Sequence, residues 1–322
     1  METLAPDGPY TVIADGNRPR SWASPHRVRF GYGPTVLSQI AVVRECRESA
    51  EIKDVLITAR HGTVLRILGI PILGEYGAVH GVYLWCGTND VAPSERRFTA
   101  AWEWDSKTKL AHHGPGIEGD ILGVPKSAHR DIRAHTDFFR RVVRFDGRMS
   151  YYDFVAKLDP RESWDGEVTI LREDGSLRQL HIFARAYIEA GARAVRGLVN
   201  DVTDIHQPDT SLEMPALRAV AAADGDPAGL IALDYSTVYE WLSAPNGELR
   251  RWVEEVPDIH PDDWDDWSCA CRAVLEGDDV AAVNVRLRFG QAEWIRVVAH
   301  INNLNSSERS LGLIRITSSV DL

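Results

Sequence analysis

The sequence has 322 residues, of which 44% are hydrophobic and 26% are charged, and its 36 Lys and Arg against 47 Asp and Glu give a net charge of −11 at pH 7. This length suits two or three domains of ordinary size. The acidic balance argues against a nucleic-acid partner, and no stretch approaches the roughly 18 apolar residues of a membrane span. The N-terminus lacks a secretion signal, so we expect a cytoplasmic protein.

The first segment, residues 1–95, begins with a lead-in rich in Pro, Gly and Asp, which predicts extended chain over residues 1–30. Pro34 fits the first turn of a helix over residues 35–48, where apolar residues recur at helical spacing. β-Branched and aromatic residues then predict three strands, at 55–59, 63–70 and 79–86.

The second segment, residues 96–206, opens with an amphipathic strand, and one face of this strand carries Phe98, Ala100, Trp102 and Trp104. Residues 120–158 have mostly helical spacing of their apolar residues. Three further strands are predicted at the end of the segment, at 164–172, 177–189 and 194–202. Asp174-Gly175 is a hairpin signal between the first two of these strands.

The third segment follows a predicted linker at residues 207–216 and extends over residues 217–322. It has an acidic helical stretch at 261–276 and strand signals at 230–233, 238–242, 280–288, 293–301 and 311–318. A constant spacing of 115 residues separates Gly175 from Gly290 and Gly197 from Gly312. We therefore interpret the second and third segments as copies of one unit, against the alternative of a chance match between strand-rich segments.

The second segment carries a family resemblance in three stretches. The runs 164–181 and 195–205, together with the opening Trp102-Glu-Trp-Asp, resemble the strands and Asp-Gly hairpin of PAS sensor domains. In the third segment, residues 259–264 resemble the His-Pro-Asp-Asp turn of the same family. The first segment is compatible with a divergent GAF-like or PAS-like domain, and the whole resembles actinobacterial proteins with one GAF-like and two PAS-like domains and no effector.

This resemblance implies an α+β fold with three sensor-type domains, each an antiparallel sheet flanked by helices. We place a divergent GAF-like (or PAS-like) domain at residues 1–95, a PAS-like domain at 96–206, a linker at 207–216 and a second PAS-like domain at 217–322. Members of the family commonly hold haem, flavin, a nucleotide or a small organic ligand between the sheet and its helices. The cysteine motif for covalent flavin is absent here, and His135 is the one candidate for an axial haem ligand in the middle domain, so the sequence requires no cofactor.

No residue pattern predicts a catalytic or metal site. Gly114-Pro-Gly-Ile-Glu-Gly119 matches the letters of a dinucleotide-binding motif, but it lacks the flanking strand and long helix and predicts a turn. Cys269 and Cys271 lack further metal ligands, and the Asp-rich stretch near His260 suits a helix start. The candidates for a ligand pocket are aromatic side chains that are more typical of a core: Trp102, Trp104, Phe183 and Tyr187.

The sequence thus predicts a non-enzymatic scaffold of sensor domains that integrates small-molecule or protein signals and relays them through protein–protein contacts. A protein partner would supply the missing effector, and a small-molecule ligand is compatible with this hypothesis. Two alternatives stay open: an enzyme of unrecognised chemistry, which would need a His or carboxylate pair with perturbed titration in a pocket, and a transcriptional co-regulator, which would need a basic patch.

Overall fold

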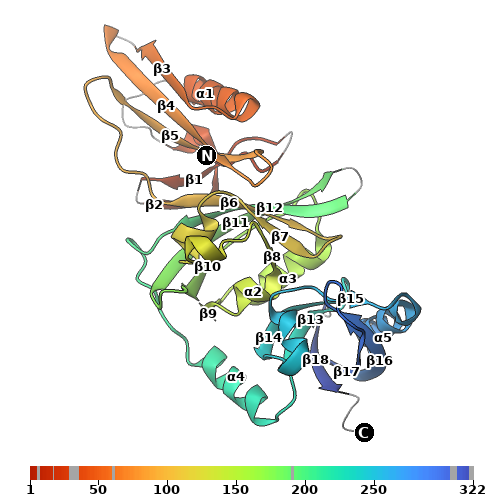
Figure 1. Ribbon diagram of the computed structural model, residues 1–322. Coiled ribbons are helices and arrows are strands. Elements are labelled where there is room, and N and C mark those ends of the chain that lie inside the picture. The colour runs from red at the N-terminus through yellow and green to blue at the C-terminus, as the bar shows by residue number, and fades with distance from the viewer. Residues whose placement is uncertain are drawn as a thin grey trace.

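The computed structural model describes residues 1–5, 8–16, 18–28, 36–59, 62–189, 192–304 and 310–318. Within these residues the strands form three larger antiparallel sheets and a small two-stranded one, and the larger sheets lie in series along the molecule (Figure 1). Helices flank the sheets, which confirms the expected α+β fold class. No helix of the described residues is both long and apolar enough to cross a membrane.

The first sheet has three strands in the order β3-β4-β5, and one helix covers one of its faces. The elements are α1 (Val36–Ser49), β3 (Lys53–Thr58), β4 (Val64–Leu73) and β5 (Val79–Thr88). The helix buries an apolar stripe, Val42, Val43 and Cys46, against Ile67 and Val82 of the sheet. This stripe is the source of the helical spacing in the sequence.

The N-terminal lead-in is extended and lies between the first and middle sheets (Figure 1). It contains β1 (Val12–Asp15), β2 (Arg18–Ala23) and a 3-10 turn at Pro25–Arg27. A small apolar cluster joins it to the middle sheet through Leu4, Ile13, Ala101, Phe183 and Leu198. The first domain is therefore fixed to the middle one by a dry contact in addition to the connecting chain.

The middle sheet has seven strands in the order β8-β7-β6-β12-β11-β10-β9. Its strands are β6 (Thr99–Asp105), β7 (Leu110–His113), β8 (Ile132–Ala134), β9 (Val142–Arg144), β10 (Ser163–Leu171), β11 (Leu177–Glu189) and β12 (Ala192–Asp201). Its helical elements are a π-helical turn (Ile117–Ile121), a 3-10 turn (Lys126–Ala128), α2 (His135–Phe139) and α3 (Arg148–Lys157).

The expectation of mostly helical structure over residues 120–158 is only partly correct. Gly123, with a φ of +69°, and Pro125 interrupt the first helical turn, and two three-residue strands, β8 and β9, extend the two edges of the sheet. The apolar residues of such short strands also fit a helical spacing, so periodicity cannot distinguish the two over three residues.

The third sheet has six strands in the order β14-β13-β18-β17-β16-β15. The strands are β13 (Ala228–Ala232), β14 (Thr237–Ser243), β15 (Asp258–Ile259), β16 (Val280–Arg288), β17 (Ile295–Asn303) and β18 (Leu311–Ser318). Its helical elements are η5 (Gly247–Val253), η6 (Pro261–Asp263) and α5 (Trp264–Glu276). The third segment also contains a helix that is not among the predicted elements, α4 (Glu213–Ala223), which begins inside the expected linker at residues 207–216.

The two larger sheets share one topology, which supports the interpretation of a duplicated unit. Their cores are β7-β6-β12-β11-β10 and β14-β13-β18-β17-β16, so each first strand lies beside the last strand of its unit. The matched hairpin glycines, Gly175 and Gly290, have φ values of +80° and +60°, a region that favours glycine. The constant spacing in the sequence thus corresponds to equivalent turns and strands.

Candidate functional site

A small cavity lies on the helix side of the middle sheet. Its volume is about 70 Å³, and its lining is mostly apolar and aromatic, with Trp102, Ile121, Phe138, Phe139 and Tyr151 among the side chains. Pockets for organic cofactors usually measure about 300–1,000 Å³. The space therefore fits a few water molecules or a very small ligand, and neither a haem nor a flavin fits this arrangement of side chains.

His135, at the start of α2, is the main polar group of this cavity. Its side chain is 7% exposed, and its Nε2 lies 3.2 Å from the hydroxyl of Tyr151. The other ring nitrogen, Nδ1, has no hydrogen-bond partner among the described residues. Burial, with a smaller contribution from His113, lowers the pKa of His135 to about 3, so the ring is neutral at physiological pH.

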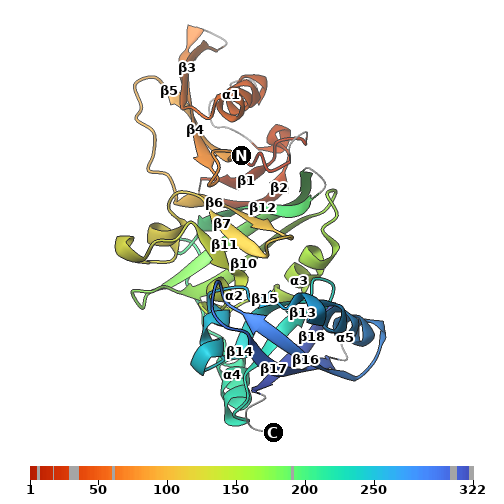
Figure 2. The same ribbon diagram turned by 45° about the vertical axis from the view of Figure 1, so that its right-hand side comes forward.

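Side chains of the third domain pack against His135 and its aromatic neighbours. The ring of Tyr239, on β14, lies 5.2 Å from the His135 ring and stacks on Tyr152 of α3 at 5.3 Å with an interplanar angle of 3°. Tyr235 packs edge-on against Trp104 at 5.9 Å. Both views place α2 and α3 between the middle sheet and the third domain (Figure 1 and Figure 2). The core of the middle domain is thus closed by its neighbour.

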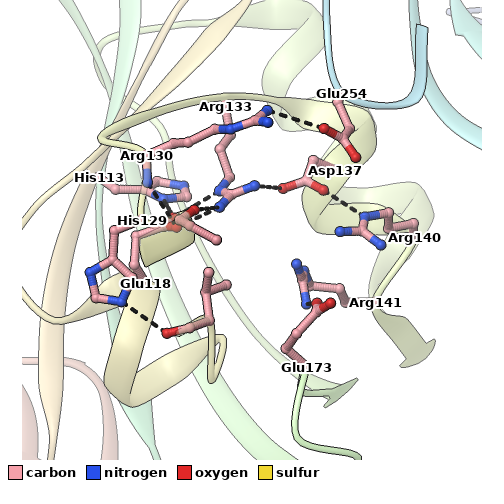
Figure 3. Close-up of polar contacts among 12 residues, drawn as sticks. His113, Glu118, His129, Arg130, Arg133, Asp137, Arg140, Arg141, Glu173 and Glu254 are labelled. Carbon is pink, nitrogen blue, oxygen red and sulfur yellow. Dashed lines mark hydrogen bonds and ion pairs between the residues drawn. The ribbon is translucent and has the colours of Figure 1, made fainter. Parts of the chain in front are cut away.

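A buried network of ion pairs lies next to the cavity (Figure 3). Arg133 donates two hydrogen bonds to Glu118, of 2.8 and 2.5 Å, and one of 2.7 Å to Asp137. His113 Nδ1 lies 2.7 Å from Glu118 Oε1, and Arg140 donates to Asp137. Burial alone would raise the pKa of Glu118, but the hydrogen bonds from Arg133 and His113 outweigh it and lower the pKa to about 2.

A second buried ion network joins the middle and third domains. Glu240, on β14, is fully buried and pairs with Arg148 of α3 and with Arg218 of α4. The hydroxyl of Tyr152 donates a 3.3 Å hydrogen bond to the same carboxylate. Arg218 also donates to the backbone oxygens of Phe139 and Val142, so α4 is tied to both domains. The sequence alone does not indicate this group, because Arg148 and Tyr152 lie in the second segment, whereas Glu240 and Arg218 lie in the third.

The four aromatic residues proposed as pocket candidates do not form one pocket. Trp102 lines the cavity, and Trp104 is 1% exposed behind it, in the core shared with Tyr239. Phe183 and Tyr187 lie on the opposite face of the sheet, because Phe183 packs on Trp22 of the N-terminal lead-in and Tyr187 donates to Glu103. Side chains alternate between the two faces of a sheet along each strand, so the two pairs lie on opposite faces although all four residues are aromatic.

The opposite face of the sheet carries its own polar contact with the first domain. His80 of β5 is fully buried and places Nε2 2.7 Å from Glu103 Oε1, and its Nδ1 lies 3.2 Å from the oxygen of Gly197. Burial opposes the charge of Glu103, but hydrogen bonding to His80, with further help from Arg196, lowers its pKa to about 2. This cluster is structural, because it is enclosed between two domains.

The glycine-rich run at 114–119 contains a turn, as predicted, and it also permits close packing of the backbone. A Cβ on Gly114 would lie 2.4 Å from the oxygen of Leu73 and 2.7 Å from that of Ala101, so only glycine permits this close approach of two backbones. Gly116 has a φ of +93° at the start of the π-helical turn. Among the described residues, no group of three or more His, Cys, Asp or Glu side chains has the arrangement of a metal site.

Antiparallel sheets flanked by helices are compatible with sensor-type domains, and known proteins similar to the chain were found at two levels. Residues 1–95 match the family described as "Rv3651-like, N-terminal". The chain is similar to the crystal structure of an uncharacterised protein from Mycobacterium tuberculosis, with 20% identity and a TM-score of 0.79 over 99% of this chain and 95% of that one. At this identity the likeness concerns the fold. No curated protein matches the sequence.

Two partial likenesses involve sensor proteins. A sensory box histidine kinase/response regulator from Burkholderia thailandensis is 20% identical, with a TM-score of 0.27 over 39% of this chain and 90% of that one. The N-terminal domain of a diguanylate cyclase with a PAS/PAC sensor from Marinobacter aquaeolei is 14% identical, with a TM-score of 0.28 over 34% of this chain and 100% of that one.

The neutral state of His135 predicts a loss of stability in mild acid. Its folded pKa of about 3 lies below the value of 6.5 expected in the unfolded chain, so the unfolded state binds the extra proton as the pH falls below 6.5. Stability should decrease by about 1 kcal/mol per pH unit through this group. His113 and the hydroxyls of Tyr151 and Tyr239 are the titratable groups around it.

Urea midpoints of the native chain and of His135→Leu, measured between pH 6.5 and 5, test this expectation. The interval keeps Glu118 ionised, since its pKa is about 2. The other histidines are present in both proteins, so their contribution to the pH dependence cancels when the two are compared. The native chain should lose stability more steeply than the variant, and equal slopes would show that His135 does not titrate on unfolding.

Proposed function

We propose that this chain is a non-catalytic signalling protein of sensor-type domains, in which the third domain acts as the built-in occupant of the middle one. The observation that carries this proposal is the position of Tyr239. This third-domain side chain is 1% exposed and belongs to the same core as Trp104 and Phe139 of the middle domain. Its aromatic contacts with His135 and Tyr152 lie next to the small cavity of the middle domain, which His135 lines.

A population shift supplies the mechanism. A small ligand that enters the cavity, or a protein that binds the third domain, favours an arrangement in which Tyr239 has left the core. Each binds one arrangement better than the other, and that difference in affinity moves the equilibrium. Surfaces that are covered in the docked arrangement then become available to an effector protein. The signal is thus relayed through contacts between domains and proteins.

The polar pairs of the protein support a structural role over a catalytic one. His113–Glu118 and His80–Glu103 are His and carboxylate pairs within hydrogen-bond distance. A carboxylate with a pKa of about 2 is a poor general base at neutral pH, and each of these two is also held by an arginine. We therefore propose no reaction for them.

Replacing Tyr239 by alanine tests the proposal. The variant removes the ring that contacts His135 and stacks on Tyr152 and leaves an empty space there, so the third domain should undock in a measurable fraction of molecules. We expect a larger radius of gyration in solution scattering and at least a fivefold increase in binding of an apolar fluorescent dye. Tyr76→Ala, at a tyrosine that is 68% exposed on the first domain, is the matched control.

The result that would refute the proposal is a Tyr239→Ala protein with the scattering curve and dye binding of the control. A variant that loses its secondary structure altogether would be replaced by Tyr239→Phe plus Tyr235→Ala. This pair keeps the ring at position 239 and removes the contact of Tyr235 with Trp104. The same two readouts apply to it.

A further inference from the structure

A large groove lies between the first and middle domains, on the side of the sheet away from Tyr239. Its volume is about 840 Å³, within the range of about 300–1,000 Å³ that ligand sites occupy. One wall is the edge of β5, from Val82 to Cys86, and the facing walls are residues 94–99, β1 and the end of β12. Figure 1 shows β5 above the strands β6 and β12 of the middle sheet.

The wall formed by β5 is a sheet edge with free backbone groups. β5 is the outer strand of its sheet, and its other side pairs with β4. The segment at Met1 already pairs with this edge, because Met1 N donates to Val82 O and Val82 N donates to Met1 O, each at 2.7 Å. Thr3 N also donates to His80 O. This edge therefore accepts an extended chain.

The outward-facing groups continue beyond Val82 into the groove. In an antiparallel strand the N–H and C=O of every second residue point to the same side, so Leu84 and Cys86 present the next two sets of backbone groups. Neither residue donates or accepts a backbone hydrogen bond on this side within the part of the chain that the structure describes. Such a row of unpaired groups is a template for one more strand.

The side chains that line the groove indicate which kind of molecule could bind there. Tyr83, Leu84, Trp85 and Cys86 are all half-buried, as expected of a strand whose outer neighbour is missing. Arg96 lines the groove, is exposed, and forms no ion pair among the described residues. The two other arginines of the groove, Arg97 and Arg178, are already engaged by Asp204 and Asp201.

We propose that this groove binds an extended peptide segment of a partner protein, which adds to β5 as a fourth strand through Leu84 and Cys86. Backbone hydrogen bonds give the affinity, and apolar side chains at alternate positions cover the half-buried edge. An acidic residue of the peptide pairs with Arg96. The site extends the proposed relay by giving the partner a place to bind, but its test involves no residue near Tyr239, so either proposal can fail alone.

A displayed library of random linear dodecapeptides, selected against the full chain, supplies the probe. The enriched peptides should carry alternating apolar residues and at least one acidic residue. In hydrogen–deuterium exchange they should protect the amides of Leu84 and Cys86, while the amide of Val82 is already protected by Met1. Their affinity should fall at least tenfold for Leu84→Pro, because proline removes the outward N–H without affecting the bonds to β4.

Leu84→Ala is the matched control, since it shortens the same side chain and keeps the N–H group. Its affinity should stay within threefold of the native value. Arg96→Glu should weaken acidic peptides at least fivefold, and Cys86→Pro replaces Leu84→Pro if circular dichroism shows that the latter does not fold. The proposal is overturned if no peptide is enriched, if peptides bind the proline variants unchanged, or if a second copy of the chain protects the same amides.

Discussion

Replacing Arg133 by leucine is expected to destabilise the middle domain by about 3–5 kcal/mol at pH 7. The side chain of Arg133 is 8% exposed, and it neutralises Glu118 and Asp137, which are 7% and 1% exposed. Leucine would leave two carboxylates buried with too few partners. The effect is large because an uncompensated buried charge costs far more than the net contribution of the intact pair.

The pH dependence of this effect has a definite sign. Arg133 and His113 hold the pKa of Glu118 at about 2, below its usual value of 4.5, so the bond stabilises the fold above pH 4.5 and its contribution is lost as the pH falls towards 2. The difference between native chain and Arg133→Leu should therefore shrink in acid. Urea midpoints at pH 7 and pH 3.5 measure this change.

Arg130→Leu is the control for this variant. Arg130 lies three residues away and pairs with Glu254 at the surface, with the two side chains 53% and 46% exposed (Figure 3). An exposed pair contributes roughly 0–1 kcal/mol. If Arg130→Leu and Arg133→Leu lowered the free energy of unfolding by similar amounts, the buried network would not be what stabilises the region from β7 to α2.

Replacing Glu240 by alanine is expected to separate the third domain from the middle one. Glu240 is fully buried, and its removal leaves Arg148 and Arg218 without their carboxylate. The loss should be about 3–5 kcal/mol. Because Arg148 belongs to the middle domain, the loss of its ion pair weakens the contact between the two domains. The urea transition should therefore split into two steps, and that of the third domain should come first. Tryptophan fluorescence and circular dichroism followed together would reveal the split.

Two comparisons define what Glu240 contributes. Glu255→Ala removes one partner of a surface pair whose side chains are 46% and 39% exposed, and it should cost no more than about 1 kcal/mol. Glu240→Gln retains hydrogen bonding and loses the charge, so an intermediate loss is expected. A single transition for Glu240→Ala at the position of the Glu255→Ala transition would show that the domains are held together by apolar contacts alone.

Local patterns in the sequence determine the elements and the turns. Asp174-Gly175 marks a hairpin because only the glycine tolerates a φ of +80°, and the repeated spacing to Gly290 carries the same constraint. The stripe of Val42, Val43 and Cys46 identifies α1 because its period matches a buried helix face. These features depend on neighbours within a few residues, so they could be predicted.

The site could be predicted only in part. Trp102 and Trp104 were recognised as one face of a strand, and the structure brings both to the helix side of the sheet. The partner of that face, Tyr239, is more than 130 residues away, and nothing in its local sequence specifies the docking. The local sequence likewise gives no sign that Glu240 pairs with Arg148. Contacts between domains depend on tertiary geometry, which a single sequence does not carry.

The two faces of β6 contact different domains, which limits the sequence changes that this strand can accept. Its even-numbered residues, including Trp104, belong to the core shared with the third domain, and its odd-numbered residues, Ala101 and Glu103, contact the first domain. Inserting one residue would exchange the two sets and break both contacts at once. Insertions and deletions inside β6 are therefore expected to be excluded, whereas substitutions on one face of β6 leave the contacts of the other face in place.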